Sequence, residues 1–426
     1  MSANIFRSTR RFFKNYFSQQ RALLYRNYKL FLVGQCLSNI GTWIQRMAMI
    51  WLAYTLTKSA FLLGLVGFCE QVPIFLIAPF AGVFADRWDK HKALIRIESL
   101  AMIQAVLLGI ITFMHVVDIG HIIILSLCLG VINAFEVPIR QSFVVEMVNR
   151  DKAALPNAIA VNSTVFNMSR LIGPSVAGIM INVVGEGWCF MANALSYAIV
   201  TGSLLLMRIK SDRETIKDKG NVWEQLKEGV RYINAHKIMR SLLLLLAFIS
   251  FCNASLRTLA PVFAKDILKG NANTLGWLLS SAGIGAITGA LLLTERRKPS
   301  VMRQIVSFTG FLLGSAMIAF AFSHSLFLSS IFMAFGGLAQ MMHTACTNTL
   351  LQEYVADDMR GRVMSFYTVC LQGTMPFGSL VSGSIAQVSS GVWAMVSMGV
   401  ICIVATLIFR DHRQGNLKSD TQKLKV

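Results

Sequence analysis

Charged residues are scarce in this sequence of 426 residues: only 14% are Asp, Glu, Lys or Arg, whereas 54% are hydrophobic. A soluble globular protein usually has about 25% charged residues. The apolar residues form long runs, such as 40–56, instead of alternating with polar ones. Crossing a bilayer takes roughly 20 apolar residues as a helix, whereas a barrel needs short alternating segments. The composition therefore excludes an ordinary soluble domain and predicts a helical membrane protein.

Paired cysteines and catalytic motifs are also missing. The eight cysteines all lie inside apolar runs and none forms a Cys-x-x-Cys pair, so we expect small packing residues and no disulfide or zinc site. The sequence has no Ser–His–Asp arrangement, metal-ligand spacing or Walker-type loop. We expect no enzyme, catalytic residue, metal or cofactor, and an ion or substrate gradient as the energy source. A cleavable signal peptide is not expected either, because no small-residue cleavage site precedes the first long apolar run.

Twelve segments are long and apolar enough to span a membrane. They are residues 29–55, 59–84, 92–115, 121–147, 156–184, 187–209, 240–264, 272–294, 302–323, 326–352, 362–387 and 391–409. We expect an all-α membrane protein with two six-helix bundles. Its expected parts are a basic amphipathic cytoplasmic segment (1–28), the first bundle (29–209), a cytoplasmic linker with an amphipathic helix (210–239), the second bundle (240–409) and a cytoplasmic tail (410–426).

The net charge of +19 comes from basic residues that are concentrated in alternate loops. Lys and Arg gather before residue 29 and in 87–96, 208–240, 296–303 and 410–425, whereas the other loops hold only Lys58, Lys265 and Lys269. This asymmetry follows the positive-inside rule. It places both termini in the cytoplasm and argues against a nucleic-acid partner. Residues 5–17 and the linker helix are amphipathic, which favours contact with membrane lipid.

The two predicted bundles carry related sequences. Gly-Pro-Ser-Val-Ala-Gly at 173–178 is echoed by Gly-Ser-Leu-Val-Ser-Gly at 378–383, and Glu-Met-Val at 146–148 by Glu-Tyr-Val at 353–355. Each pair occupies the same place in its half. We therefore predict a parallel repeat of six helices, and transporters with internal repeats hold substrate near the midplane between the repeats.

A compact motif follows the second predicted span. It consists of Gly82, Asp86, Arg87, Lys90 and Lys92. An aspartate here can accept charge-assisted hydrogen bonds from a neighbouring helix end or arginine, and so hold one conformation. We interpret the motif as a conformational latch. The alternative, ordinary positive-inside charges, explains the lysines but not Gly82 and Asp86.

This loop resembles the signature loop of the major facilitator superfamily, from which it departs at Asp89, where the family prefers glycine. The corresponding loop of the second half, 289–298, keeps only the basic part. Residues 51–60, 133–141 and 360–365 resemble the branch that includes the bacterial enterobactin exporter and related drug-efflux proteins. The resemblance implies a secondary transporter, acting as a monomer in the bacterial inner membrane.

The fifth span contains Gly173, Pro174 and Gly178, similar to the Gly-Pro motif of antiporters in this superfamily. Ser169 replaces a further glycine of the full motif. The resemblance favours export. The alternative is a kinked helix with small packing residues.

Ionisable residues inside predicted spans are costly in a membrane and usually functional. Several continue polar stripes on spans 1, 4, 7 and 10, which line the central cavity in the fold that the sequence resembles. The cavity candidates are Gln35, Asn39, Arg46, Asn133, Arg140, Arg170, Asn253, Arg257, Gln340 and His343. The alternative is that each charge pairs with a neighbour only to hold the bundle together.

The leading hypothesis is a proton-coupled exporter of a small anionic or amphipathic molecule, such as a siderophore or a drug. Glu136 and Glu70 are the proton candidates, because a carboxyl in a dry cavity can load and release a proton. The four inward arginines outnumber these two carboxyls, which favours an anionic cargo. A proton-coupled importer of the same fold remains an alternative, as does a scaffold or sensor that transports nothing.

Overall fold

The computed structural model describes residues 21–148, 151, 153–207, 222–293, 298–356 and 359–414. It describes only the backbone of 78–87, 222–223, 225–226 and 410–414. The predicted amphipathic segment at 5–17, the C-terminal tail after 414 and the basic loop at 294–297 lie outside the described residues. The side chains of Gly82, Asp86 and Arg87 do so as well.

Twelve helical segments run through the described chain, and no strand occurs in it. The first half contains α2 (Arg26–Thr57), α3 (Ala60–Arg87), α4 (Lys90–Phe113), α5 (Ile119–Met147), α6 (Leu155–Val184) and α7 (Glu186–Leu205). The second half contains α9 (Lys237–Thr258) with α10 (Ala260–Val262) and η2 (Phe263–Ile267), α11 (Ala272–Leu292), α12 (Pro299–Ala321), α13 (Leu326–Tyr354), α14 (Arg360–Thr368) with η3 (Val369–Gly373) and α15 (Met375–Val388), and α16 (Gly391–Gln414). The predicted twelve-helix membrane fold is confirmed.

Nine of these segments in the described chain are apolar enough to be membrane spans by length and composition alone. The other three are α2, α6 and the broken helix α14–α15. These carry more polar residues, among them Gln45 and Arg46 on α2 and Arg170 on α6. Their polarity fits helices that face other helices or a cavity, since a lipid-facing helix must be apolar nearly throughout.

Short polar caps end the helices at the loops. The Asp118 carboxylate accepts a hydrogen bond from the backbone N–H of His121 (2.9 Å) and caps α5. This bond lowers the pKa of Asp118. Asn271 forms the same kind of cap on α11. Such side chains satisfy backbone N–H groups that a helix start leaves without partners.

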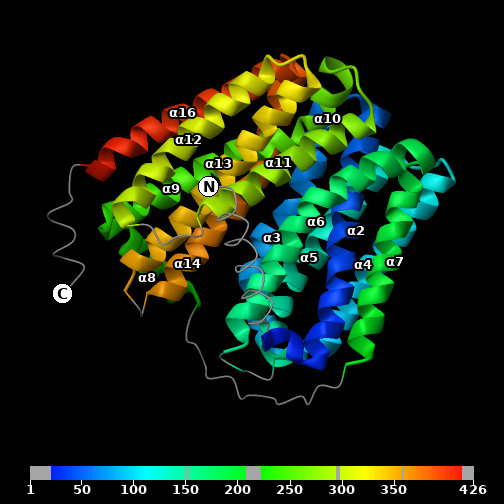
Figure 1. Ribbon diagram of the computed structural model, residues 1–426, viewed down its shortest axis with the longest axis horizontal. Coiled ribbons are helices and arrows are strands. Elements are labelled where there is room, and N and C mark those ends of the chain that lie inside the picture. Colours follow the sequence, from blue (N-terminus) through cyan, green and yellow to red (C-terminus); the bar gives the residue numbers. More distant parts are fainter. Residues whose placement is uncertain are drawn as a thin grey trace, which may run out of the picture.

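The two halves contact each other through α3 with α15 and α6 with α11 (Figure 1). The contacts begin where α2 ends and α3 begins, which we call the closed end. There the Ser59 hydroxyl donates to Gln387 Oε1 (2.9 Å), and deeper in, the Ser175 hydroxyl donates to Ser280 Oγ (2.7 Å). They continue to about the helix midpoints, where Gly373 lies against Phe75. Figure 1 shows the halves diverging toward the opposite end, which carries the linker and which we call the linker end.

The linker helix α8 (Val222–Ala235) lies within the predicted linker and contacts the second half. Among its apolar side chains, Ile233 is buried and Val230 is exposed. Glu228 forms an ion pair with Arg362 (2.8 Å), and Gly229 lies against Phe366 of α14. The buried side of α8 therefore packs on protein.

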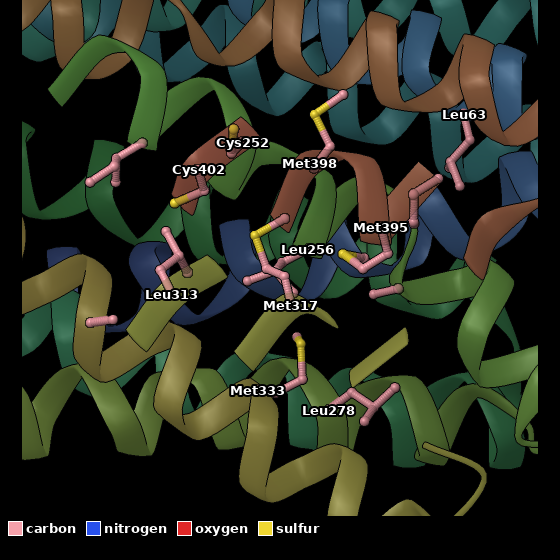
Figure 2. Close-up of a cluster of buried hydrophobic side chains, with 14 of the residues drawn as sticks. Leu63, Cys252, Leu256, Leu278, Leu313, Met317, Met333, Met395, Met398 and Cys402 are labelled. Atoms are coloured by element: carbon pink, nitrogen blue, oxygen red, sulfur yellow. The ribbon is translucent and has the colours of Figure 1, made fainter. Parts of the chain in front are cut away.

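Sulfur-rich side chains fill the core of the second half (Figure 2). Met317, Met333, Met395 and Met398 surround Leu256, and all of them are buried. The buried residues Cys252 and Cys402 lie in the same cluster, as expected for small packing residues. Methionine adapts to irregular gaps between helices, and free cysteine behaves as a small apolar residue.

We expect Gly337→Ala to destabilise the second half. A Cβ atom at Gly337 would collide with the backbone carbonyl of Ala282, where α13 packs closely against α11. Overpacking of this kind costs about 1–3 kcal/mol, and more where backbone must move. Thermal unfolding of the purified protein should show the loss. Gly202→Ala is the matched control, because a Cβ there meets nothing within 4 Å. Equal melting temperatures for the two variants would contradict the prediction.

Candidate functional site

A charged cavity lies between the two halves, below the closed end. Five helices surround it: α2, α3, α6, α9 and α11. Its lining includes Trp43, Arg46, Glu70, Pro174 and Arg257. The enclosed space is small in this conformation, about 20 Å³. Charged side chains within a membrane protein are rare and mark pathways for ions or substrates, so this cavity is the first candidate site.

Arg46 and Glu70 form an ion pair across the cavity wall. The Arg46 Nε and Glu70 Oε1 atoms are 2.8 Å apart, and the two side chains are 23% and 6% exposed. The Arg46 guanidinium also lies over the Trp43 ring, 5.7 Å from its centroid. The sequence placed Arg46 and Glu70 at similar depth on antiparallel helices, and the structure brings them together.

Arg257 has no such counter-ion. No carboxylate of a described side chain lies within 4.0 Å of its guanidinium. Arg46, Glu70 and Arg170 are all close enough to act on it electrostatically. Arg46 and Arg257 line the cavity against Glu70, which leaves a formal excess of one positive charge. Arg170, outside the lining, adds to the positive potential. The cavity can therefore stabilise an anion, because forked guanidinium donors fit carboxylates and phosphates.

Two contacts between α2 and the end of the α9 segment join the halves on the closed-end side of the cavity. The Tyr54 hydroxyl donates to the Asp266 carboxylate, and Lys265 lies over the Trp51 ring, 5.7 Å from its centroid. Asp266 and Lys265 belong to the π-helical turn η2, and π-helical turns are frequent at functional sites. A cargo can cross the closed end only if these contacts between the halves break.

A second set of ionisable side chains lies in the first half, outside that cavity. Arg140 and Glu136 pair along α5, with Nη1 and Oε1 2.9 Å apart. Glu98 on α4 is only 2% exposed and lies within electrostatic range of both. The sequence analysis missed Glu98. The signal was a carboxyl six residues past the start of the predicted span 92–115, close to Arg96 and the basic loop, where it resembles an ordinary helix-end charge.

The remaining polar candidates lie outside the cavity lining. Gln35 donates to Asn39 Oδ1 along α2 (3.3 Å), and Asn253 is half-buried. The buried atoms Asn133 Nδ2 and Gln340 Oε1 have no hydrogen-bond partner among the described residues.

His343 is fully buried and faces α12. Its Nδ1 lies 3.2 Å from Thr309 Oγ1 and 3.2 Å from the carbonyl oxygen of Val306. The structure therefore places His343 in the packing between α13 and α12.

The motif at 82–92 crosses from α3 to α4. Lys90 pairs with Glu146 at the end of α5 (2.7 Å). Asp89, the departure from the superfamily pattern, caps α4 by accepting a hydrogen bond from the backbone N–H of Lys92 (3.1 Å). Its carboxylate therefore stabilises the start of α4, where glycine would offer no side-chain cap.

Gly173, Pro174 and Gly178 lie where α6 meets other helices closely. Gly173 faces Trp43 of α2, and Pro174 presents its carbonyl to Gly276 of α11. Gly178 faces the backbone of Ala272. The small residues thus allow close contact between the halves beside the cavity, in agreement with the packing alternative.

Twelve membrane helices in two contacting halves, with a charged cavity between them, define a transporter of the major facilitator superfamily. Residues 21–425 match the family model described as transmembrane secretion effector, and the chain belongs to this family. It is a multi-pass membrane transporter of small molecules and not an enzyme.

Similar proteins include transporters of different cargo. The chain is 28% identical over 382 residues to the staphyloferrin A transporter of Staphylococcus aureus, covering 89% of this chain and 95% of that protein. It is 22% identical to macrolide efflux protein A of Streptococcus pyogenes, covering 92% and 99%. A bacterial homologue of the human lysosomal transporter Spinster, in its inward-facing and occupied conformation, matches with a TM-score of 0.74 at 15% identity, covering 92% and 98%. The structural match supports the fold alone.

Proposed function

We propose that this protein exports a small anionic or amphipathic molecule across the bacterial inner membrane by alternating access coupled to proton antiport. The observation that carries the proposal is the cavity between the halves, where Arg257 has no carboxylate of a described side chain within 4.0 Å, beside the paired Arg46 and Glu70. An anionic group of the cargo would supply the missing charge. A siderophore is the favoured cargo class, and similarity to the staphyloferrin A transporter supports it.

The orientation follows from the basic loops. With both termini in the cytoplasm, the closed end faces outward and the linker end faces the cytoplasm. The cavity would then receive cargo from the cytoplasm in this conformation. Export requires the halves to rock, so that contacts such as Tyr54 with Asp266 break while the linker end closes. The motif at 82–92 lies at the linker end. There it would act as a latch that holds the linker end shut after the halves have rocked.

A proton gradient is the proposed energy source. Glu70 can release Arg46 when it takes up a proton, which would couple proton binding to the charge of the cavity. Glu136, beside Arg140, is the second coupling candidate. The two carboxyls lie in different parts of the first half, so coupling and cargo binding need not use the same atoms.

Culture supernatants and everted membrane vesicles test the proposal. Comparing metabolites in supernatants with and without the gene should reveal one or a few anionic compounds that need the gene to accumulate outside. Everted vesicles should then take up such a compound, and collapsing the proton gradient should stop uptake. Uptake by right-side-out vesicles alone would favour the importer. No gene-dependent compound and no transport in either vesicle would favour a scaffold or sensor.

A further inference from the structure

Glu98, Glu136 and Arg140 form an ionisable cluster inside the first half, which we call the carboxyl cluster. Two of its members form the α5 ion pair, and the third, Glu98, is 2% exposed on α4. No described lysine or arginine side chain lies within 4.0 Å of the Glu98 carboxylate. None of the three lines the cavity between the halves.

Contacts at either side of Glu98 fix which residues it faces. Along the antiparallel pair α4 and α5, Lys90 bonds Glu146, and Gln104 donates to the carbonyl oxygen of Leu125. As residue numbers on α4 rise, those on α5 fall at the same 1.5 Å per residue. Counting from the two contacts places Glu98 level with residues 138 and 131 of α5, a range that contains Glu136.

The same argument places Tyr197 of α7 beside Glu98. His91 Nε2 lies 2.7 Å from the carbonyl oxygen of Leu204, and further along the same antiparallel pair Gly109 lies against Met191. Counting from these two contacts places position 98 level with residues 197 and 202 of α7. Tyr197 lies within electrostatic range of Glu98. The Tyr197 hydroxyl in turn lies 3.4 Å from Thr42 Oγ1 of α2.

Among the described side chains, the surroundings of the carboxyl cluster are otherwise apolar or neutral. The titratable groups that face Glu98 are Glu136 and Arg140 from α5 and Tyr197 from α7, while Arg96 on its own helix is exposed. One turn from Glu136, Asn133 is 7% exposed and its Nδ2 has no hydrogen-bond partner among the described residues. Residues three apart share a helix face, so an unused amide donor borders the carboxyls.

We propose that Glu98 and Glu136 share one exchangeable proton and form the proton-binding site of this transporter, separate from the arginine cavity. The charges favour this. Two carboxylates with one guanidinium leave a formal charge of −1 in a low-dielectric interior, and one proton bound to a carboxylate oxygen makes the cluster neutral. Release returns the same proton to water on the other side, with no other bond changed.

The proposal rests on proton antiport as the proposed function, and it assigns cargo and proton to two sites. Helix α2 connects the two sites, since Thr42 contacts Tyr197 and Arg46 follows one turn later on the same helix. Binding at one site would therefore affect the other through α2. Glu98 acts as proton carrier and Arg140 as the fixed counter-charge.

Infrared difference spectroscopy of the purified full-length protein in lipid bilayers, without cargo, tests the site. Titration from about pH 9 to about pH 5 should produce the C=O stretching band of a protonated carboxyl in the wild type. Glu98→Gln should remove most of that band while leaving the melting temperature within a few degrees. Glu353→Gln, which removes an exposed carboxyl on α13, should retain it.

The outcomes separate this proposal from the proposed function. An unchanged band in Glu98→Gln, or no band in the wild type, overturns the proton site even if transport is proton-driven. If the band depends on Glu98 but transport does not respond to a proton gradient, the proton site is supported and the proposed proton antiport is rejected. If Glu98→Gln does not fold, Glu98→Asp must shift the band, and an unshifted band overturns the assignment.

Discussion

Replacing Arg257 with alanine is expected to weaken binding of an anionic cargo by about 10- to 100-fold, while binding of a lipophilic cation stays the same or improves. A hydrogen bond to a charged group contributes about 1.5–3 kcal/mol, which corresponds to this range of affinity. Arg257 has no counter-ion within 4.0 Å among the described side chains, so its donors are available to cargo. The change would also lower the excess positive charge of the cavity.

Equilibrium binding to the purified protein measures the effect, with a carboxylate siderophore as the anionic probe and ethidium as the cationic probe. Arg240→Ala is the matched control, because Arg240 is exposed near the start of the same helix, α9. A wild-type protein that binds only ethidium, or equal anion binding by the two variants, would reject the anionic cavity.

Breaking the Arg46–Glu70 pair is expected to lower the free energy of unfolding by about 3–5 kcal/mol, because either single substitution leaves an uncompensated buried charge. Arg46→Met and Glu70→Leu should each show this loss. Combined in one chain they should restore most of the stability, since an apolar pair of similar volume can replace a buried ion pair. The double variant should nevertheless lose transport, because both charges are gone from the cavity.

The ion pair between Glu228 and Arg362 is the control for this double-substitution cycle. Its side chains are 59% and 29% exposed, and exposed pairs contribute about 0–1 kcal/mol. Thermal unfolding of the four variants at each pair, together with vesicle transport, gives the two coupling energies. A coupling energy at Arg46–Glu70 no larger than that at Glu228–Arg362 would show that the cavity pair is not held in a dry environment.

Much of the fold was predictable because the membrane restricts the choices. Every backbone polar group in hydrocarbon needs an internal partner, so long apolar segments must be helices. The predicted spans match the helices to within a few residues, as at 121–147 against Ile119–Met147. The same logic identified Arg46, Glu70, Glu136 and Arg257 as ionisable residues inside the membrane, since each interrupts an apolar run. The pairing of Glu136 with Arg140 was also within reach, because residues four apart share a helix face.

The sequence by itself determined the class of protein, the number of helices and the ionisable residues that the membrane must hold. The tertiary structure alone decided which of those residues meet. Arg46 contacts Glu70 instead of a cargo, and His343 packs against α12. Glu98 joins Glu136 in the carboxyl cluster. Helical periodicity specifies a face but not the helix that covers it, and contacts between helices depend on their depth and rotation relative to one another. The sequence predicted one cavity in which arginines outnumber carboxylates. The structure instead separates these charges into a positive cavity and an acidic cluster.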